Sequence, residues 1–380
     1  MKIPQSKPWI DEDEINEVVD TLRSGWLTMG PKTAKFEQLL AEYLGVKHVI
    51  VVNSCTAALH LSLVALGIGP GDEVITTTYT FAATADVILH VGAKPVFVDI
   101  ETKTYNIDPE KIKEAITPRT KAIMPVHFAG HPCDMKEIMD ISENNHLYVI
   151  EDAAHALGAE YLGKKIGSIG HTTCFSFYAT KDITTGEGGA ATTNDDQLAE
   201  KIRKLRLHGI TADAWKRHSK GSWYYEITES GFKYNITDIQ SAIGIHQIKK
   251  LDKFIDLRRK IAQTYSSELK EIKEIVTPCV KAEVKHAYHL YPILLKGMDR
   301  DSFVQKMNAT GISCSVHFIP LHLHPLYQRL FAFKKGDFPN AEWVYEREAS
   351  LPLFPRMTKD EVRYVTDSIK KIFKKEHAKT

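Results

Sequence analysis

Short apolar runs alternate with amphipathic segments through the first half of the chain, and this alternation limits the possible folds more than any other feature. We predict buried strands at 48–52, 73–78, 94–100, 121–126, 147–152 and 172–177. Helical patterns lie between them, at 54–66, 82–91, 108–116 and 134–145. Such alternation predicts an α/β fold with a mostly parallel sheet covered by helices. In sheets of this kind ligands bind beyond the carboxyl ends of the strands.

The pattern changes after residue 236. A long helical stretch, 238–269, is followed by a mixed region with predicted strands at 286–295 and 312–318. Helices are also predicted at 12–24, 302–311 and 358–376, and residues 1–10 are predicted to form an extended arm. A chain of 380 residues is long enough for about two domains of common size. We predict a large domain with the N-terminal arm over 1–245 and a smaller C-terminal α+β domain over 246–380.

Charge and cysteine usage exclude several classes of protein. The chain has 49 Lys and Arg against 48 Asp and Glu, so its net charge of +1 cannot attract nucleic acid or a membrane in bulk. Five cysteines contain no CxxC pair, which argues against a zinc ribbon and against a disulfide framework. The N-terminus lacks a signal-peptide core, and no run of 18 apolar residues occurs. We therefore expect a cytoplasmic protein without nucleic-acid or membrane partners.

The segment FSFYATKDITTGEGG (175–189) gives the strongest local indication of chemistry. A strand ends near residue 177, and Lys181 then lies in a loop before a glycine-rich turn. Gly186, Gly188 and Gly189 allow the backbone to approach a ligand closely. A lone lysine is most often exposed to solvent, so the glycines are what make Lys181 a candidate catalytic group.

A second segment, VIEDAAHALGA (149–159), places Asp152 at the carboxyl end of an apolar strand and His155 three residues later. A buried carboxylate needs a partner. The residues alone leave three interpretations open. Asp152 and His155 could ligate a metal, Asp152 could pair with a cationic heterocycle, or Asp152 could cap a helix.

Two further turns follow predicted strands. The helix that starts in NSCTAALHL (53–61) has Cys55, Thr56 and Ala57 in its first turn, where free N–H groups and hydroxyls can bind an anion. Ser54 could equally act there as an ordinary helix cap. In TYTFAATA (78–85), Phe81 stands where an aromatic ring can stack on a flat ligand, although a lone Phe is more often part of a core.

Taken in this order, the segments resemble the DegT/DnrJ/StrS family of sugar-nucleotide aminotransferases, which are pyridoxal-phosphate (PLP) enzymes of fold type I. The resemblance covers nearly the whole chain, from SGWLTMGP (24–31) through RLHGI and GFKYNITDIQSAIG to SLPLFPRMT (350–358). It implies that Lys181 carries PLP, that Asp152 pairs with the pyridine nitrogen and that Phe81 stacks on the ring. It also implies that His155 lies beside the cofactor and that the phosphate is held by Cys55, Thr56, Ala57 and Ser176.

The resemblance also implies a partner subunit and a reaction. Asn235 matches an asparagine that reaches the phosphate of the neighbouring subunit, which implies a homodimer with shared active sites. Relatives that remove a hydroxyl carry histidine in place of Lys181, so the lysine favours amination over dehydration. The expected reaction moves an amino group from L-glutamate, leaving 2-oxoglutarate, to a nucleotide-linked keto sugar used in amino-sugar and polysaccharide biosynthesis. The sequence is most similar to members that aminate carbon 4 of UDP-linked sugars, and carbon 3 is the alternative.

Substrate contacts are predicted from three segments. The resemblance implies contacts at Thr28, Met29 and Gly30, and at His322 in the loop 317–325. An aromatic and basic insertion at 208–226 either contacts a nucleotide diphosphate or packs on the dimer partner. Its candidate residues are Trp215, Lys216, Arg217, Trp223 and Tyr224.

No metal is predicted, because the histidines of 317–325 have no cysteine or carboxylate at ligand spacing nearby. Two functions of other classes stay open beside the aminotransferase. One is a non-catalytic regulator that keeps the fold and binds a ligand, and the other is a zinc hydrolase that uses Asp152, His155 and the histidines of 317–324.

Overall fold

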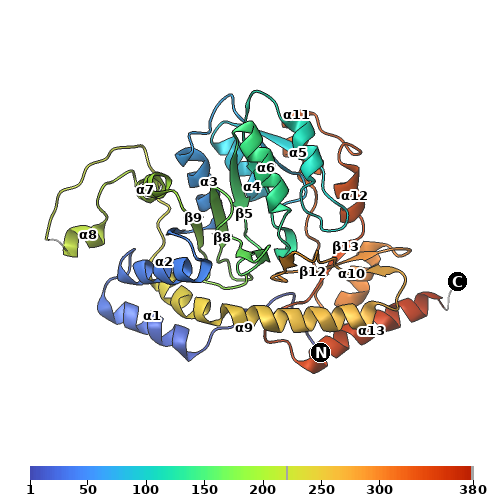
Figure 1. Cartoon of the computed structure of the whole chain (residues 1–380). Coiled ribbons are helices and arrows are strands. Elements are labelled where there is room, and N and C mark those ends of the chain that lie inside the picture. Colours follow the sequence, from blue (N-terminus) through green and yellow to red (C-terminus); the bar gives the residue numbers. More distant parts are fainter. Residues whose placement is uncertain (220, 378–380) are drawn as a thin grey trace.

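The computed structural model describes residues 1–219 and 221–377, and its centre is a seven-stranded sheet in the order β1-β9-β8-β5-β4-β2-β3 (Figure 1). The strand β9 is antiparallel to both of its neighbours, whereas the pairs from β8 to β3 are all parallel. The mostly parallel α/β sheet is therefore confirmed, and all six predicted strands belong to it. The strands are β1 (His48–Val52), β2 (Glu73–Thr77), β3 (Lys94–Val98), β4 (Thr120–Met124), β5 (Tyr148–Asp152), β8 (Thr172–Ser176) and β9 (Gly189–Thr193).

Alternate side chains of each strand enter two different cores, as the pleat of a strand requires. In β1, Val49 and Val51 join the core beneath α2, α5, α6 and α9, whereas Ile50 and Val52 join the core beneath α3, α4 and α7. Helices therefore cover both faces, as parallel sheets require. Their bounds are α2 (Pro31–Leu44), α3 (Cys55–Ala65), α4 (Ala82–His90), α5 (Pro109–Ala115), α6 (Met135–Asn145), α7 (Asp196–Leu205) and α9 (Asp238–Leu269).

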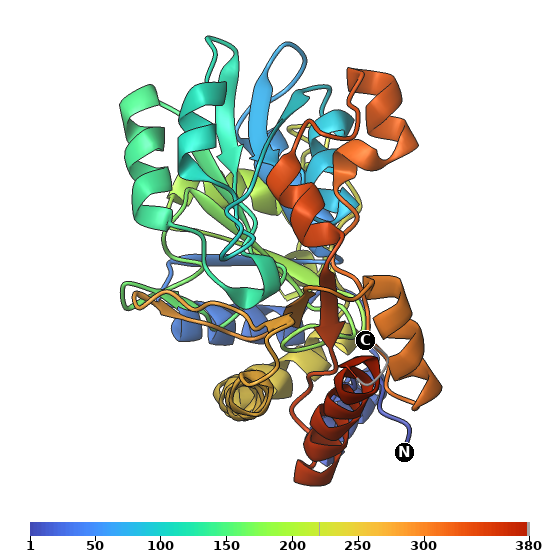
Figure 2. The ribbon, with the colours of Figure 1, turned by 90° about the vertical axis from the view of Figure 1, so that its right-hand side faces the viewer.

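The long helix α9 runs beneath the large sheet and continues under the C-terminal region, and Figure 2 shows it nearly end-on. Its N-terminal half packs on α1 (Glu12–Ser24) and α2. The C-terminal region contains an antiparallel sheet, β10-β12-β13, which shares a core with α9, α10 and α13. The predicted boundary at residue 245 falls inside α9, so the division into two domains stays a prediction. The elements are β10 (Ile275–Val276), β12 (Tyr291–Leu295), β13 (Glu348–Leu351), α10 (Arg300–Ala309) and α13 (Lys359–His377).

Smaller elements complete the described chain. They are the sheet β11-β6-β7, the helices α8, α11 and α12, and two 3₁₀ turns. Figure 1 shows α8 on a long connection that stands away from the body. Within the described residues, no helix has the length and apolar character to cross a membrane. The bounds are β6 (Glu160–Tyr161), β7 (Lys164–Lys165), β11 (Val284–Lys285), α8 (Ala214–Ser219), α11 (Pro325–Phe331), α12 (Pro339–Tyr345), η1 (Phe128–Gly130) and η2 (Leu321–Leu323).

Two predicted strands of the C-terminal region are corrected by the structure. The strand predicted at 286–295 is reduced to β12, because Ala287 N and Leu290 N donate to Gly130 O and Ala129 O instead of to a sheet. The segment 312–318 is not a strand. Its β-pairing with other described segments consists of single bridges at Ile312 and Ser315, and His317 N donates to the Glu348 carboxylate.

Candidate active site

Four segments converge at one end of the large sheet. The carboxyl ends of β1, β5 and β8 meet there with the amino end of the antiparallel β9. They open onto a cavity of about 710 Å³. We call the residues that this edge contributes the sheet wall: Ser54, Cys55, Thr56, Asp152, Ser176, Lys181 and Gly188. The opposite side, which we call the C-terminal wall, consists of His289, Leu290, Ser315, His317, Phe318 and Leu353.

The first turn of α3 faces the cavity at the end of β1. Ser54 caps this helix, and its Oγ accepts a hydrogen bond from Ala57 N at 3.1 Å. Gly189 lies against the same turn, where a Cβ atom would approach Cys55 N within 2.4 Å. The close approach explains the glycine, since any side chain would have to displace backbone. The result is a helix N-terminus that presents its positive end to the cavity, as anion sites do.

Asp152 ends β5 and is nearly buried, with a side chain held from two directions. Its Oδ2 accepts from Thr84 Oγ1 at 2.8 Å and its Oδ1 accepts from Ala154 N at 3.2 Å. Burial raises the pKa of Asp152, whereas the bonds from Thr84 and Ala154 and the nearby Lys181 lower it. A carboxylate held in this way can stabilise a cation at the floor of the cavity.

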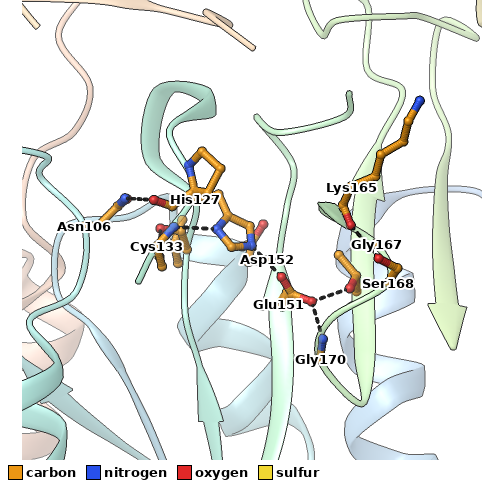
Figure 3. A network of polar contacts seen from close by, with 12 residues as sticks. Asn106, His127, Cys133, Glu151, Asp152, Lys165, Gly167, Ser168 and Gly170 are labelled. Atoms are coloured by element: carbon orange, nitrogen blue, oxygen red, sulfur yellow. Dashed lines mark hydrogen bonds and ion pairs between the residues drawn. The ribbon is translucent and has the colours of Figure 1, made fainter. Parts of the chain in front are cut away.

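The preceding residue, Glu151, points to the opposite face of the sheet and fixes the strand end (Figure 3). Its carboxylate accepts from His127 Nε2 at 2.8 Å, from Thr173 Oγ1 at 2.7 Å and from Gly170 N at 2.7 Å. His127 Nδ1 accepts from Cys133 N, so the ring proton lies on Nε2, and His127 N donates to Asp152 O. Glu151 thereby connects β4, β5 and β8 directly behind Asp152.

Lys181 stands in the loop after β8, where its backbone N donates to Tyr178 O at 2.9 Å. Burial lowers the pKa of Lys181, whereas Cys55, Asp152 and Asp182 raise it. The net direction favours the neutral amine, which is the nucleophilic form. Within the described lining, Lys181 is the only lysine, and no arginine lines the cavity.

Aromatic rings and two histidines enclose the rest of the cavity. Phe81 is 64% exposed at its mouth, with its ring centroid 6.1 Å from that of Phe318. The rings of His155 and His289 stack at 4.4 Å, and the Phe318 ring is nearly parallel to His155 at 6.0 Å. Burial and Lys181 hold the pKa values of both histidines well below the ordinary range, so both rings are neutral.

His317 is fixed by a chain of polar contacts from β13. Its Nδ1 is 2.9 Å from Ser350 Oγ, which is 2.5 Å from Glu348 Oε1. Burial lowers the pKa of His317 to about 4 and raises that of Glu348 to about 8. The C-terminal wall therefore presents a neutral imidazole to the cavity at pH 7.

The structure brings seven of the predicted site residues together around the cavity: Cys55, Thr56, Phe81, Asp152, His155, Ser176 and Lys181. It places the others elsewhere. Ala57 is partnered by Ser54, and Thr28, Met29 and Gly30 lie outside the lining, where Gly30 N donates to Asp238. Trp215 packs on Trp26, and Asn235 Nδ2 donates to Ile236 O. The Lys216 side chain lies outside the described part of the structure.

His322, expected to touch substrate, is fully buried between Thr78 and Glu342 and does not line the cavity. The neighbouring His317 does line it. Sequence reasoning also missed Gln5, Ser6, Tyr178 and His289. No motif marks these residues, although the position of Tyr178 between Ser176 and Lys181 was a usable indication.

The arrangement combines an amine with a lowered pKa, a buried carboxylate and a helix N-terminus that can hold an anion. These groups suit a phosphorylated ligand that carries an electrophilic carbon and a cationic ring. Among the described residues, no group of three or more His, Cys, Asp and Glu side chains is placed to hold a metal ion.

Comparison with known proteins extends these observations. The model of the DegT/DnrJ/EryC1/StrS aminotransferase family matches residues 8–370. The chain is 50% identical to the spore coat polysaccharide biosynthesis protein SpsC of Bacillus subtilis, covering 98% of this chain and 97% of SpsC. Its structure is similar to that of Helicobacter pylori PseC, an aminotransferase involved in pseudoaminic acid biosynthesis, with a TM-score of 0.92 and 34% identity. The match covers 99% of this chain and 100% of the PseC chain. It is also similar to the PLP form of Spr1654 from Streptococcus pneumoniae, a candidate sugar aminotransferase, with a TM-score of 0.93, 36% identity and coverage of 99% of each chain.

Proposed function

Because the chain belongs to the DegT/DnrJ/EryC1/StrS aminotransferase family, we propose that it aminates a nucleotide-linked keto-deoxysugar with L-glutamate as the amino donor. The protein is a PLP-dependent sugar aminotransferase of fold type I. The observation that carries the proposal is the convergence of Lys181, Asp152 and the α3 N-terminus on one cavity.

The residues of the sheet wall fit PLP. The turn of α3 would hold the phosphate, since Gly189 leaves it open to close approach, and Ser176 lies beside it in the cavity lining. Asp152 would hold the proton on the pyridine nitrogen, and Phe81 would cover the ring from the mouth. When bound, PLP supplies an aldehyde carbon that exchanges amino groups and a protonated ring that withdraws electrons from the reacting carbon.

The chain's own side chains account for the remaining chemistry. Lys181 Nζ would act as the nucleophile toward the cofactor's aldehyde carbon in its neutral form, which its lowered pKa favours. Once displaced by substrate, the same amine can move a proton at the reacting carbon as a general base and acid. Burial raises the pKa of Asp152, and the bonds from Thr84 and Ala154 oppose this by favouring the charged form that would pair with the ring nitrogen. The rings of the C-terminal wall limit the access of water to these groups.

A sugar substrate is supported by the relatives and by the lining. SpsC is named for polysaccharide biosynthesis and PseC for an amino-sugar acid. Apart from Lys181, Asp152 and Glu187, the described lining offers neutral donors and acceptors, such as Gln5, Ser6, Tyr178 and Ser315, together with the rings of Phe81 and Phe318. Such a surface suits hydroxyl groups and sugar ring faces. We propose carbon 4 of a UDP-linked sugar as the position of amination.

A panel of keto-sugar nucleotides tests this proposal. The holoenzyme is incubated with L-glutamate and either UDP-linked 4-keto-6-deoxyhexoses, their dTDP-linked counterparts or 3-keto sugars, and products are identified by mass spectrometry and NMR. We expect an amino sugar with one equivalent of 2-oxoglutarate from the UDP-linked 4-keto sugar. Preference for a 3-keto sugar would move the amination to carbon 3. Ligand binding without turnover of any substrate would favour the non-catalytic regulator.

We also propose a homodimer in which Asn235 serves the partner's site. Asn235 lies on a segment that joins the end of β1, since Asn53 N donates to Tyr234 O, yet its side chain is outside the cavity of its own chain. The connection that carries α8 stands away from the body, with Trp223 83% exposed, and so offers a surface for a second copy. Trp215 and Arg217 on this connection would then approach the partner's substrate.

Mixed dimers test the sharing of sites. Lys181→Ala and Asn235→Asp are each expected to be inactive, the second because it sets a carboxylate against the phosphate. When the two variants are co-expressed, random pairing makes about half of the dimers mixed, and one site in each mixed dimer carries neither change. About a quarter of all sites should then be intact. Verified mixed dimers without recovered activity would show that Asn235 serves its own chain.

A further inference from the structure

Near Lys181, five buried side-chain atoms of the described residues have no hydrogen-bond partner. They are both carboxylate oxygens of Asp182, Arg258 Nε, His289 Nδ1 and His155 Nδ1. Buried polar atoms are nearly always hydrogen-bonded, so a cluster of orphaned atoms in one place needs an explanation. Two of the residues, His155 and His289, line the cavity, whereas Asp182 and Arg258 lie deeper.

The distances between these side chains show that Asp182 lies near two possible donors without a hydrogen bond to either. Asp182 Oδ1 is 3.4 Å from His289 Nδ1 and 3.9 Å from Arg258 Nε. The side chains of Asp182 and Arg258 are each 3% exposed. The guanidinium is anchored on its other side, because Nη1 donates to His289 O at 3.2 Å and to Leu353 O at 3.1 Å. Arg258 therefore cannot move freely toward the carboxylate.

We propose that Asp182, Arg258 and His289 form a buried polar site that holds an ordered water, and that through this site Asp182 determines which nitrogen of His289 carries the proton. A buried water needs two to four polar partners, and the orphaned atoms of Asp182, Arg258 and His289 number four. The water donates to Asp182 and accepts from Arg258 Nε. His289 Nδ1 carries a proton and donates it toward the same carboxylate or the water. The effect of this site on turnover rests on the proposed function, whereas the water and the His289 tautomer do not.

The protonation state of His289 affects the cavity because the His289 ring is stacked on that of His155. With the proton on Nδ1, His289 keeps an unprotonated Nε2, and its ring is stacked on that of His155 with the centroids 4.4 Å apart. Asp182 is thus a positioning residue, since it acts through His289 on His155 beside Lys181. Burial raises the pKa of Asp182 to about 7, although Arg258 and Lys181 lower it, so the carboxylate form that pairs with Arg258 and accepts from His289 predominates above neutral pH.

The test begins with the full chain free of substrate. A high-resolution crystal structure should show density for a water within hydrogen-bond distance of Asp182 and of Arg258 Nε or His289 Nδ1. Imidazole ¹⁵N shifts at pH 7, assigned by comparison with His289→Gln, should show His289 protonated on Nδ1. An empty space between these groups, or a proton on Nε2, would overturn the inference. Neither readout depends on finding the substrate, so the result stands whether or not the proposed function does.

A double variant, Asp182→Leu with Arg258→Met, removes both charges and avoids leaving one buried charge without a partner. We expect the water to be lost, His289 to show both tautomers and kcat to fall about two- to tenfold with KM changed less than twofold. The control is Glu73→Leu with Arg119→Met, which removes an ion pair at the amino ends of β2 and β4, the sheet end opposite the cavity. An unchanged His289 tautomer in the first variant would contradict the assigned role of Asp182. A fall in kcat of equal size in the control would do the same.

Discussion

The two walls of the cavity are built by different means. Each residue of the sheet wall stands at or within a few positions of a strand end, where a local turn fixes its direction. The residues of the C-terminal wall follow no repeated pattern and are held by partners far away in the chain. His317, for example, is fixed from Glu348 and Ser350. We propose that the first wall holds the cofactor and that the second contributes contacts to the substrate.

The difference explains what could be predicted from the sequence. Asp152 could be placed at the sheet edge because a short apolar run predicts the strand that it ends. Lys181 was indicated by the glycine-rich turn that follows it, and the roles of both residues came from the family resemblance. His289 and Gln5 could not be found, because their positions in the cavity depend on contacts between segments that the sequence does not connect. The strand β9 was missed since its residues, GAATT, are small and carry no apolar alternation. Its role is nonetheless local, because Gly189 opens the α3 turn.

His322 shows the same limit in the C-terminal region. The loop 317–325 was expected to reach the cavity, and His317 at its start does so. His322 instead turns inward, where its Nδ1 is 2.8 Å from Thr78 Oγ1 and its Nε2 is 2.9 Å from Glu342 Oε1. Which of several histidines in a loop faces a site is determined by the partners available to each ring. These partners come from α12 and from the end of β2, and neither is near the loop in sequence.

The contrast between the walls predicts that the largest loss of activity comes from the sheet wall. Lys181→Ala removes both the attacking amine and the proton carrier, so turnover should fall by at least about 10³-fold. The melting temperature should stay close to that of the wild type, because the loop's backbone bonds do not involve the side chain. Steady-state assays and thermal denaturation measure the two quantities. Lys136 is exposed on α6, and the variant Lys136→Ala serves as a control that should keep full activity. A variant Lys181→Ala that retains wild-type turnover would refute the assignment of the sheet wall.

Asp152→Asn tests the same wall with a smaller expected effect. The amide cannot hold a proton on the ring nitrogen, and the loss of one charge-assisted hydrogen bond is worth about 1.5–3 kcal/mol. The rate should therefore fall by about one to two decades, while PLP stays bound through the other residues of the wall. Stopped-flow half-reactions with glutamate and the absorbance of bound cofactor after dialysis separate the two effects. A change of less than twofold in rate would mean that another group holds the ring nitrogen.

Glu348→Gln addresses the C-terminal wall and should affect stability more than chemistry. Burial raises the pKa of Glu348 to about 8, from 4.5 in the unfolded chain. Between these values the folded protein binds the proton that the unfolded chain has lost, so the free energy of unfolding of the wild type falls as pH rises from about 4.5 to about 8. Glutamine mimics the protonated acid and removes this slope. We expect the variant to match the wild type below about pH 4.5 and to be more stable by roughly 4 kcal/mol at pH 8, because the pKa of Glu348 rises from 4.5 to about 8 on folding.

Urea denaturation at several pH values measures the difference in the free energy of unfolding between Glu348→Gln and the wild type. A variant less stable than the wild type at pH 8 would contradict the prediction. His317 has the opposite linkage, because its pKa is lowered to about 4, so its contribution to stability grows as pH rises to about 6.5 and is constant above that. Of these two groups, only Glu348 contributes a slope between pH 7 and 8, and the difference between the wild type and Glu348→Gln separates it from the other titrating groups. Since Ser350 joins the two groups, turnover should change by less than tenfold if Glu348 only supports the imidazole. If Glu348→Gln lost as much turnover as Lys181→Ala, proton transfer would also depend on the C-terminal wall. The proposed difference in function between the two walls would then be wrong.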